Sequence, residues 1–171
     1  MLWLLIACTA SDSGKDSGLD STVDTQDSGQ IGFFPLEETP YWESFESGVA
    51  TGLAWADIDK DGFAELIVSY GNDVQRGPLT LYDNIGGILD THTLWQSETR
   101  AFYGHLDVGD INGDGWTDVV VSRFLGDNGF PDPGGIEVFI NQEGSLPDTP
   151  SWMSSESFYS FSNALGDLDG D

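Results

Sequence analysis

Short runs of hydrophobic residues, separated by polar turn residues, recur along the chain from about residue 31 onward. Four of these runs are AELIVSY (64–70), LTLYD (79–83), TDVVVSRF (117–124) and IEVFIN (136–141). They are rich in Val, Ile, Phe and Tyr and bounded by Gly, Pro, Asn or Asp, which is typical of β-strands. No segment of a dozen residues keeps the 3.6-residue hydrophobic period of a helix. The pattern therefore predicts an all-β protein.

The strand-like runs belong to an internal repeat. The phrase ADIDKDGFAELIVSY returns as GDINGDGWTDVVVSR and, in part, as GDLDGD, with leading acids 53 and then 57 residues apart. A second phrase repeats in step with the first, because residues 79–89 correspond to residues 136–146, and the insertion 126–135 accounts for the longer second unit. Units of about 55 residues with several strands each have the size of propeller blades. We expect the tryptophans Trp42, Trp55, Trp95, Trp116 and Trp152 to lie mainly in the core between blades.

The acid-rich phrase has the ligand spacing of a loop that wraps one hard cation. Counted from its first acid, oxygen-bearing side chains fall at positions 1, 3, 5 and 9, and Gly at position 6 permits a sharp turn. The backbone carbonyl at position 7 and one or two waters would complete the six to eight oxygens that calcium prefers. The expected ligands are Asp57, Asp59, Asp61, Phe63 (by its carbonyl) and Glu65 in the first loop, and Asp110, Asn112, Asp114, Trp116 (by its carbonyl) and Asp118 in the second.

An EF-hand begins with the same spacing but does not fit this sequence. It requires a bidentate Glu at position 12 and a helix on each side of the loop. Position 12 is Val68 in the first loop and Val121 in the second, and both lie inside strand-like runs. Dockerin repeats are excluded for the same reason, because a helix should follow their loops.

DIDKDGFAELIV and DINGDGWTDVVV resemble the calcium loops of FG-GAP/VCBS-type repeats, the blades of integrin-α-like β-propellers. LYDNIGG and VFINQEG resemble the strand and turn of the same repeats, and the resemblance covers residues from about 45 to 171. It implies a partial β-propeller with blades of about four antiparallel strands, a calcium ion at each loop and an extracellular binding role. It also extends the ligand set to a third loop, through Asp167, Asp169 and Asp171. We expect the first loop to bind calcium more tightly than the second, where Asn112 replaces an acid.

Charge excludes one class of partner. The chain has 30 acidic residues against 5 basic ones, which gives a net charge of −25. Such a protein repels nucleic acids and anionic lipid headgroups. A role in binding DNA or RNA is therefore not expected.

The N-terminal residues indicate export. Residues 1–7 form an apolar run too short to cross a bilayer, which we interpret as the remnant of a signal peptide. LIAC resembles the lipobox of bacterial lipoproteins, so Cys8 is the predicted site of lipidation at the outer membrane or cell surface. An incidental Cys in an ordinary signal peptide, with a secreted product, is the alternative. Residues 8–30 are rich in Asp, Ser and Gly and are expected to form a disordered tether, followed by an incomplete propeller over residues 31–171.

The sequence favours a binding function over catalysis. His92 and His105 lack zinc-ligand spacing and are expected on the surface, and no strong nucleophile motif is present. The favoured hypothesis is a non-catalytic binding or adhesion scaffold for an extracellular protein or carbohydrate. Because the repeats end within the third loop, we interpret the chain as the N-terminal part of a longer protein. The alternatives are an enzyme for polysaccharides or lipids whose catalytic residues lie beyond residue 171, and a calcium-responsive structural protein.

Overall fold

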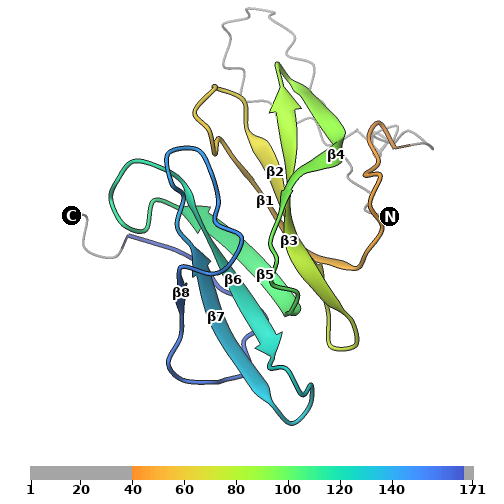
Figure 1. Cartoon of the computed structure of the whole chain (residues 1–171), viewed down its shortest axis with the longest axis vertical. Helices are drawn as coiled ribbons and strands as arrows, with labels where there is room; N and C mark the ends of the chain where they lie inside the picture. Colours follow the sequence, from red (N-terminus) through yellow and green to blue (C-terminus); the bar gives the residue numbers. More distant parts are fainter. Residues whose placement is uncertain (1–39, 168–171) are drawn as a thin grey trace, which may run out of the picture.

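The computed structural model describes residues 40–167, which form two antiparallel β-sheets of four strands each (Figure 1). The first sheet contains β1 (Ala50–Ala56), β2 (Glu65–Gly71), β3 (Arg76–Ile85) and β4 (Ile88–Gln96). The second contains β5 (Phe102–Gly109), β6 (Asp118–Leu125), β7 (Pro133–Phe139) and β8 (Trp152–Met153). In each sheet the strands pair in chain order. The all-β prediction is confirmed, and the four predicted strands are β2, β3, β6 and β7.

Several predictions fall on residues that the structure does not describe. These are the signal peptide remnant (1–7), the lipidation site Cys8, the tether (8–30), and the third-loop acids Asp169 and Asp171.

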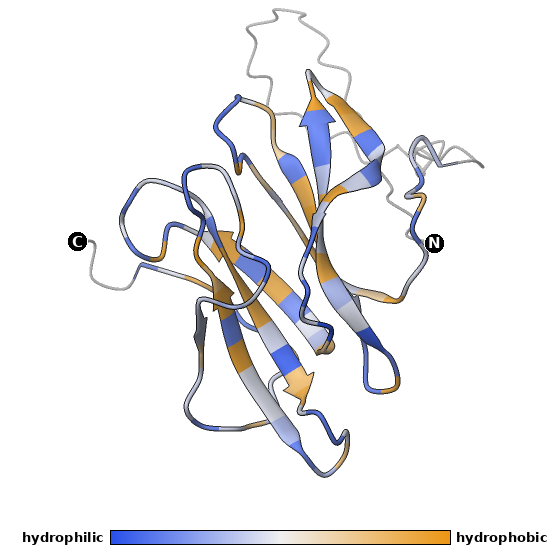
Figure 2. Cartoon of the chain, in the orientation of Figure 1, coloured by the Kyte–Doolittle hydropathy of each residue, from blue (hydrophilic) through white to orange (hydrophobic). Residues whose placement is uncertain are grey.

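The order of the strands explains their hydrophobicity. Strand β2 is flanked by β1 and β3 and is buried along its whole length, so most of its sequence, ELIVSYG, is apolar. Strand β4 pairs only with β3, and most of its residues are exposed or half-buried, so its sequence mixes polar and apolar residues. In Figure 2 the most hydrophobic residues accordingly lie along the strands, while the loops are mainly hydrophilic.

One core lies between the two sheets. It contains residues from both repeats, including Ile67 and Leu79 of the first sheet and Val119 and Phe139 of the second. The indole of Trp95 packs edge-on against the ring of Phe139, with centroids 6.1 Å apart. Burial of this shared apolar surface is the main source of attraction between the sheets. The two sheets are therefore stacked as neighbouring blades of a partial propeller.

A smaller core lies on the opposite face of the first sheet. It contains Trp42, which precedes β1, together with four residues of β2 and β3: Leu66, Val68, Tyr70 and Tyr82. Of the tryptophans expected in the core, Trp42 is buried and Trp95 packs against the shared core. The expectation is wrong for Trp55 and Trp152, which are 41% and 54% exposed in this structure. Trp55 lies in β1 and Trp152 in β8, and each of these strands is at one edge of its sheet. The described residues include no helix long and apolar enough to cross a membrane.

Candidate metal centre

The two acid-rich loops occupy equivalent places in the two blades. Residues 57–64 connect β1 to β2, and residues 110–117 connect β5 to β6, at the same end of the two sheets (Figure 1). The ninth-position acid is in each case the first residue of the following strand, Glu65 in β2 and Asp118 in β6. The strand therefore fixes this acid at the base of the loop, as expected from the sequence.

The same four hydrogen bonds shape both loops. The acid at position 9 accepts a hydrogen bond from the backbone N–H of position 2, and the side chain at position 1 accepts one from the N–H of position 6. The side chain at position 3 accepts the N–H of position 5, and the side chain at position 5 accepts the N–H of position 7. In the first loop the donors and acceptors are Ile58 to Glu65 Oε2 (2.7 Å), Gly62 to Asp57 Oδ2 (3.2 Å), Asp61 to Asp59 Oδ1 (3.0 Å) and Phe63 to Asp61 Oδ1 (2.8 Å). In the second they are Ile111 to Asp118 Oδ2 (2.9 Å), Gly115 to Asp110 Oδ2 (2.7 Å), Asp114 to Asn112 Oδ1 (3.0 Å) and Trp116 to Asp114 Oδ1 (2.8 Å). Each loop conformation is thus held by the loop's own acidic side chains and, in the second loop, also by Asn112.

Both loops take the left-handed backbone conformation at positions 4 and 6. At position 6 the φ angles are 95° for Gly62 and 86° for Gly115, which confirms the turn predicted from the glycine. At position 4 they are 75° for Gly113 but 63° for Lys60, a residue type that rarely adopts this conformation. The sequence did not indicate a left-handed position there, because Lys60 replaces the glycine.

Replacing Gly62 by Ala is expected to lower the free energy of unfolding by about 1–2 kcal/mol, the cost of the left-handed conformation for a residue with a side chain. A Cβ added at Gly62 would meet no atom within 4 Å, so the effect isolates backbone strain. Urea denaturation of the full chain measures it. Gly166→Ala is the matched control, since Gly166 also has open space around it and does not have a left-handed φ. Equal stability changes in the two variants would contradict the argument.

The first loop gathers carboxylates that are not fully satisfied. Carboxylate oxygens of Asp57, Asp59 and Asp61 lie within 4.8 Å of one another. Two carboxylate oxygens of this loop, Asp57 Oδ1 and Glu65 Oε1, are buried and accept no hydrogen bond from the described residues. Burial raises the pKa of Glu65, opposed by the hydrogen bond from the Ile58 N–H, and the nearby charges of Asp59 and Asp57 raise it further. Buried oxygens without partners destabilise a fold unless a ligand satisfies them, so this donor set fits a hard cation.

The second loop is satisfied internally. Asp110 Oδ1 accepts the N–H groups of Gly113 (2.8 Å) and Asp114 (3.1 Å), and the amide of Asn112 donates to Asp114 Oδ2 (2.9 Å). Hydrogen bonds from Trp116 and Asn112 lower the pKa of Asp114, and the charge of Lys60 adds to this. The second oxygen of Asp118 also has a donor, because it accepts the backbone N–H of Asn141 at 2.8 Å. A cation in this loop would have to share or replace these partners.

The structure places only the first acid of the predicted third loop, Asp167, within the described residues. Just before it, the N–H of Leu165 donates to Asp107 Oδ2 of β5 at 2.7 Å. This bond ties the start of the third repeat to the second blade.

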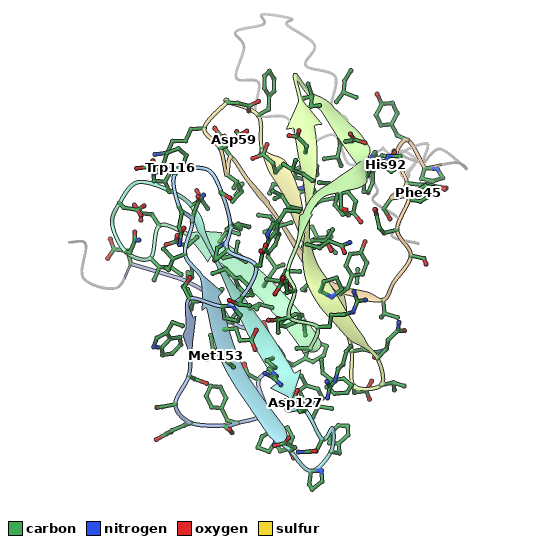
Figure 3. The ribbon with its side chains drawn as sticks, in the orientation of Figure 1. Phe45, Asp59, His92, Trp116, Asp127 and Met153 are labelled. Carbon is green, nitrogen blue, oxygen red and sulfur yellow. The ribbon has the colours of Figure 1, made fainter. Side chains whose placement is uncertain are left out.

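Two contacts join the loops, and they are made by Asn141 and Lys60, which were not among the predicted site residues. The amide nitrogen of Asn141 donates to the carbonyl of Ile58 in the first loop (2.9 Å) and to that of Thr117 beside the second (3.1 Å). The ammonium of Lys60 lies 3.9 Å from the centre of the Trp116 ring, and Figure 3 shows Trp116 close to Asp59. The repeat could have pointed to Asn141, because the corresponding residue in the first repeat, Asn84, is also an Asn. Asn84 donates to the carbonyl of Ala64 at 2.9 Å.

A comparison with protein-family models agrees with this repeat geometry. A model described as an FG-GAP-like repeat matches residues 57–121 and again residues 110–171. Each match begins at the first acid of a loop, and the first match runs through the second loop, so the two matches are in register with the repeat seen in the structure. No curated protein matches the sequence.

Proposed function

Since the chain belongs to the FG-GAP-like repeat family, we propose that it forms a calcium-stabilised β-propeller segment that acts as a non-catalytic binding or adhesion scaffold outside the cell. FG-GAP repeats build propeller-type domains that are often used in binding or adhesion. The observation that supports calcium is a pair of buried carboxylate oxygens in the first loop, on Asp57 and Glu65, that accept no hydrogen bond from residues 40–167. The proposed binding partner is an extracellular protein or carbohydrate.

The proposed ligands follow the loop positions. In the first loop the ion would be held by Asp57, Asp59, Asp61, Glu65 and the carbonyl of Phe63. We propose that this loop has the highest affinity for calcium. Weaker sites would involve the second-loop and third-loop residues Asp110, Asn112, Asp114, Trp116 (carbonyl), Asp118, Asp167, Asp169 and Asp171. A divalent cation would neutralise the repulsion among these acids and supply the partner that the buried oxygens lack.

Calcium is expected to raise the thermal midpoint of the full chain, and magnesium to raise it much less. Magnesium requires near-octahedral geometry and retains its waters, whereas calcium accepts an irregular set of protein oxygens. A free calcium concentration about a hundred times Kd would stabilise the fold by about 2.7 kcal/mol per site. Differential scanning fluorimetry with each ion measures the shift.

Glu65→Gln is the variant that tests the assignment. Glutamine keeps an oxygen that can accept the Ile58 N–H but removes the buried charge. Without calcium the variant should be at least as stable as the wild type, because no carboxylate has to be buried. With calcium it should gain less stability than the wild type. Equal responses to the two metals, or a Glu65→Gln response equal to that of the wild type, would rule out the proposed site.

We further propose that Cys8 carries a lipid anchor and that residues 8–30 tether the propeller away from the membrane. Supporting this are the LIAC sequence and the Asp-, Ser- and Gly-rich composition that follows it. Metabolic labelling with a radioactive fatty acid in a bacterial host should label the full-length protein and leave Cys8→Ser unlabelled. Equal labelling of the two proteins would contradict the anchor.

A further inference from the structure

Lys60 is the only basic residue in the two acid-rich loops that the structure describes. It stands at position 4, where the second and third loops have Gly113 and Gly170. Its φ angle of 63° is in the left-handed region, which glycine adopts freely and a lysine adopts only against a steric cost. Residues held in such conformations concentrate at functional sites, so the contacts of the Lys60 side chain bear on function.

The Lys60 side chain extends from the first loop to the second. Its ammonium lies 3.9 Å from the centre of the Trp116 ring. A Cβ atom built on Gly115 would lie 3.5 Å from Lys60 Nζ, so the ammonium is also beside the backbone at position 6 of the second loop. None of the ion pairs formed within residues 40–167 includes Lys60. The positive charge is therefore not paired with an acid of its own loop.

The Trp116 ring holds the ammonium at this place. The face of an indole ring attracts a cation more strongly than that of any other aromatic side chain. The ring is itself fixed between the blades, because a Cβ built on Gly144 would lie 3.5 Å from it and 3.3 Å from the Cα of Asp59. Figure 3 shows Trp116 and Asp59 close together. The stacking of the two blades thus brings a charge from the first loop to the rim of the second.

This charge adds to a difference that the loops already have. The second loop contains three carboxylates against four in the first, because Asn112 replaces an acid. The ammonium of Lys60 lowers the net negative charge around the second loop further. Its influence extends to Asp114, whose pKa is lowered by hydrogen bonds from Trp116 and Asn112 and then by the charge of Lys60.

We infer that Lys60 sets the calcium affinity of the second loop, because its ammonium partly neutralises the carboxylates there and repels an entering divalent cation. The inference rests on the proposed binding of calcium by the loops. Lys60 is not itself a ligand, since an ammonium has three donors and no acceptor. The two loops therefore fill at different calcium concentrations, and the residue that keeps the second loop weak belongs to the first.

Lys60→Gln tests this role, because it removes the charge and keeps a side chain at the strained position. It is introduced into a full chain whose first loop is weakened by Asp61→Asn with Glu65→Gln, so that calcium titration calorimetry reports the second loop. The calcium affinity of the second loop should rise at least about fivefold at low ionic strength, the lower end of the usual coupling between two sites. In about 1 M NaCl, where charges are screened within about 3 Å, the gain should fall below about twofold.

The reciprocal background reports the first loop. Asp114→Asn with Asn112→Ala removes two ligand side chains from the second loop, and both are exposed. Lys60→Gln should raise the calcium affinity by a smaller factor in this background, because the ammonium lies beside the second loop.

Two further substitutions separate charge from backbone strain. Lys60→Arg keeps a cation that can lie on the Trp116 ring and should restore the affinity measured with lysine. Lys60→Gly reproduces the residue of the other two loops, removes both the charge and the strain, and should match Lys60→Gln. Should the Glu65→Gln background fail to fold by circular dichroism, Asp61→Asn alone takes its place.

The results distinguish this inference from the proposed function. An unchanged second-loop affinity in Lys60→Gln, an equal gain in both backgrounds, a gain that high salt does not reduce, or a gain with Lys60→Gly alone would each overturn the role of Lys60. Any of these outcomes leaves the proposed function standing if the first loop binds calcium. If neither the wild type nor any variant binds calcium, the proposed function and the inference both fail.

Discussion

Replacing Arg123 by Met is expected to lower the free energy of unfolding by about 3–5 kcal/mol, the usual cost of breaking a buried ion pair from one side. Arg123 Nη1 lies 3.1 Å from Glu137 Oε1, and Glu137 is 1% exposed. The hydroxyl of Tyr103 donates to the other oxygen of Glu137 at 2.7 Å. Methionine preserves most of the packing of the arginine stem but leaves the Glu137 carboxylate in the interior without its countercharge. Urea denaturation of the full chain measures the loss.

Two control variants separate burial from charge. Arg76→Met removes the exposed partner of Asp127, a pair 3.5 Å apart, and should cost no more than about 1 kcal/mol. Adding Glu137→Gln to Arg123→Met should recover more than half of the loss, because a neutral amide can still accept from Tyr103 without burying a charge. Similar losses for Arg123→Met and Arg76→Met would show that the buried pair does not hold β6 to β7.

The sequence predicted the two central strands of each sheet, β2, β3, β6 and β7, better than the strands at the edges. Strands β2 and β6 are covered on both faces, so each contains three consecutive buried aliphatic residues, LIV in β2 and VVV in β6, which give a clear strand signature. Strand β4 lies at the edge of its sheet and reads ILDTHTLWQ, in which polar residues alternate irregularly with apolar ones. Such a strand is specified by its partner β3 rather than by its own composition.

The sequence predicted the spacing of the candidate ligands but not the difference in hydrogen bonding between the two loops. Local bonds within nine residues shape each loop, so the pattern of acids and the glycine at position 6 predict them. The difference between Glu65 and Asp118 is not local, because it arises from the backbone N–H of Asn141, 23 positions after Asp118. The contact of Lys60 with Trp116 is not local either, because it depends on how the two blades stack. Only the folded arrangement brings these groups together.

Replacing Asn141 by Ala is expected to lower the free energy of unfolding by about 3 kcal/mol, since each buried polar group left without a partner costs about 1–3 kcal/mol. Asn141 is 1% exposed, its amide nitrogen serves the carbonyls of Ile58 and Thr117, and its Oδ1 accepts the N–H of Gly144 at 2.8 Å. Alanine removes all three bonds without removing the backbone bond to Asp118. Urea denaturation with and without calcium is the measurement.

The matched control is Asn84→Ala in the first blade. Asn84 occupies the equivalent position but makes a single amide bond, to Ala64, so its loss should cost only about 1 kcal/mol. The bond to Ile58 is the one that crosses from the second blade to the first loop, where Ile58 also holds Glu65. Asn141→Ala should therefore also reduce the stabilisation by calcium. Asn84→Ala removes no bond to Ile58 and should reduce the stabilisation by calcium less. If both variants lost the same stability and kept the same response to calcium, the bond from Asn141 to Ile58 would contribute nothing to the contact between the two blades.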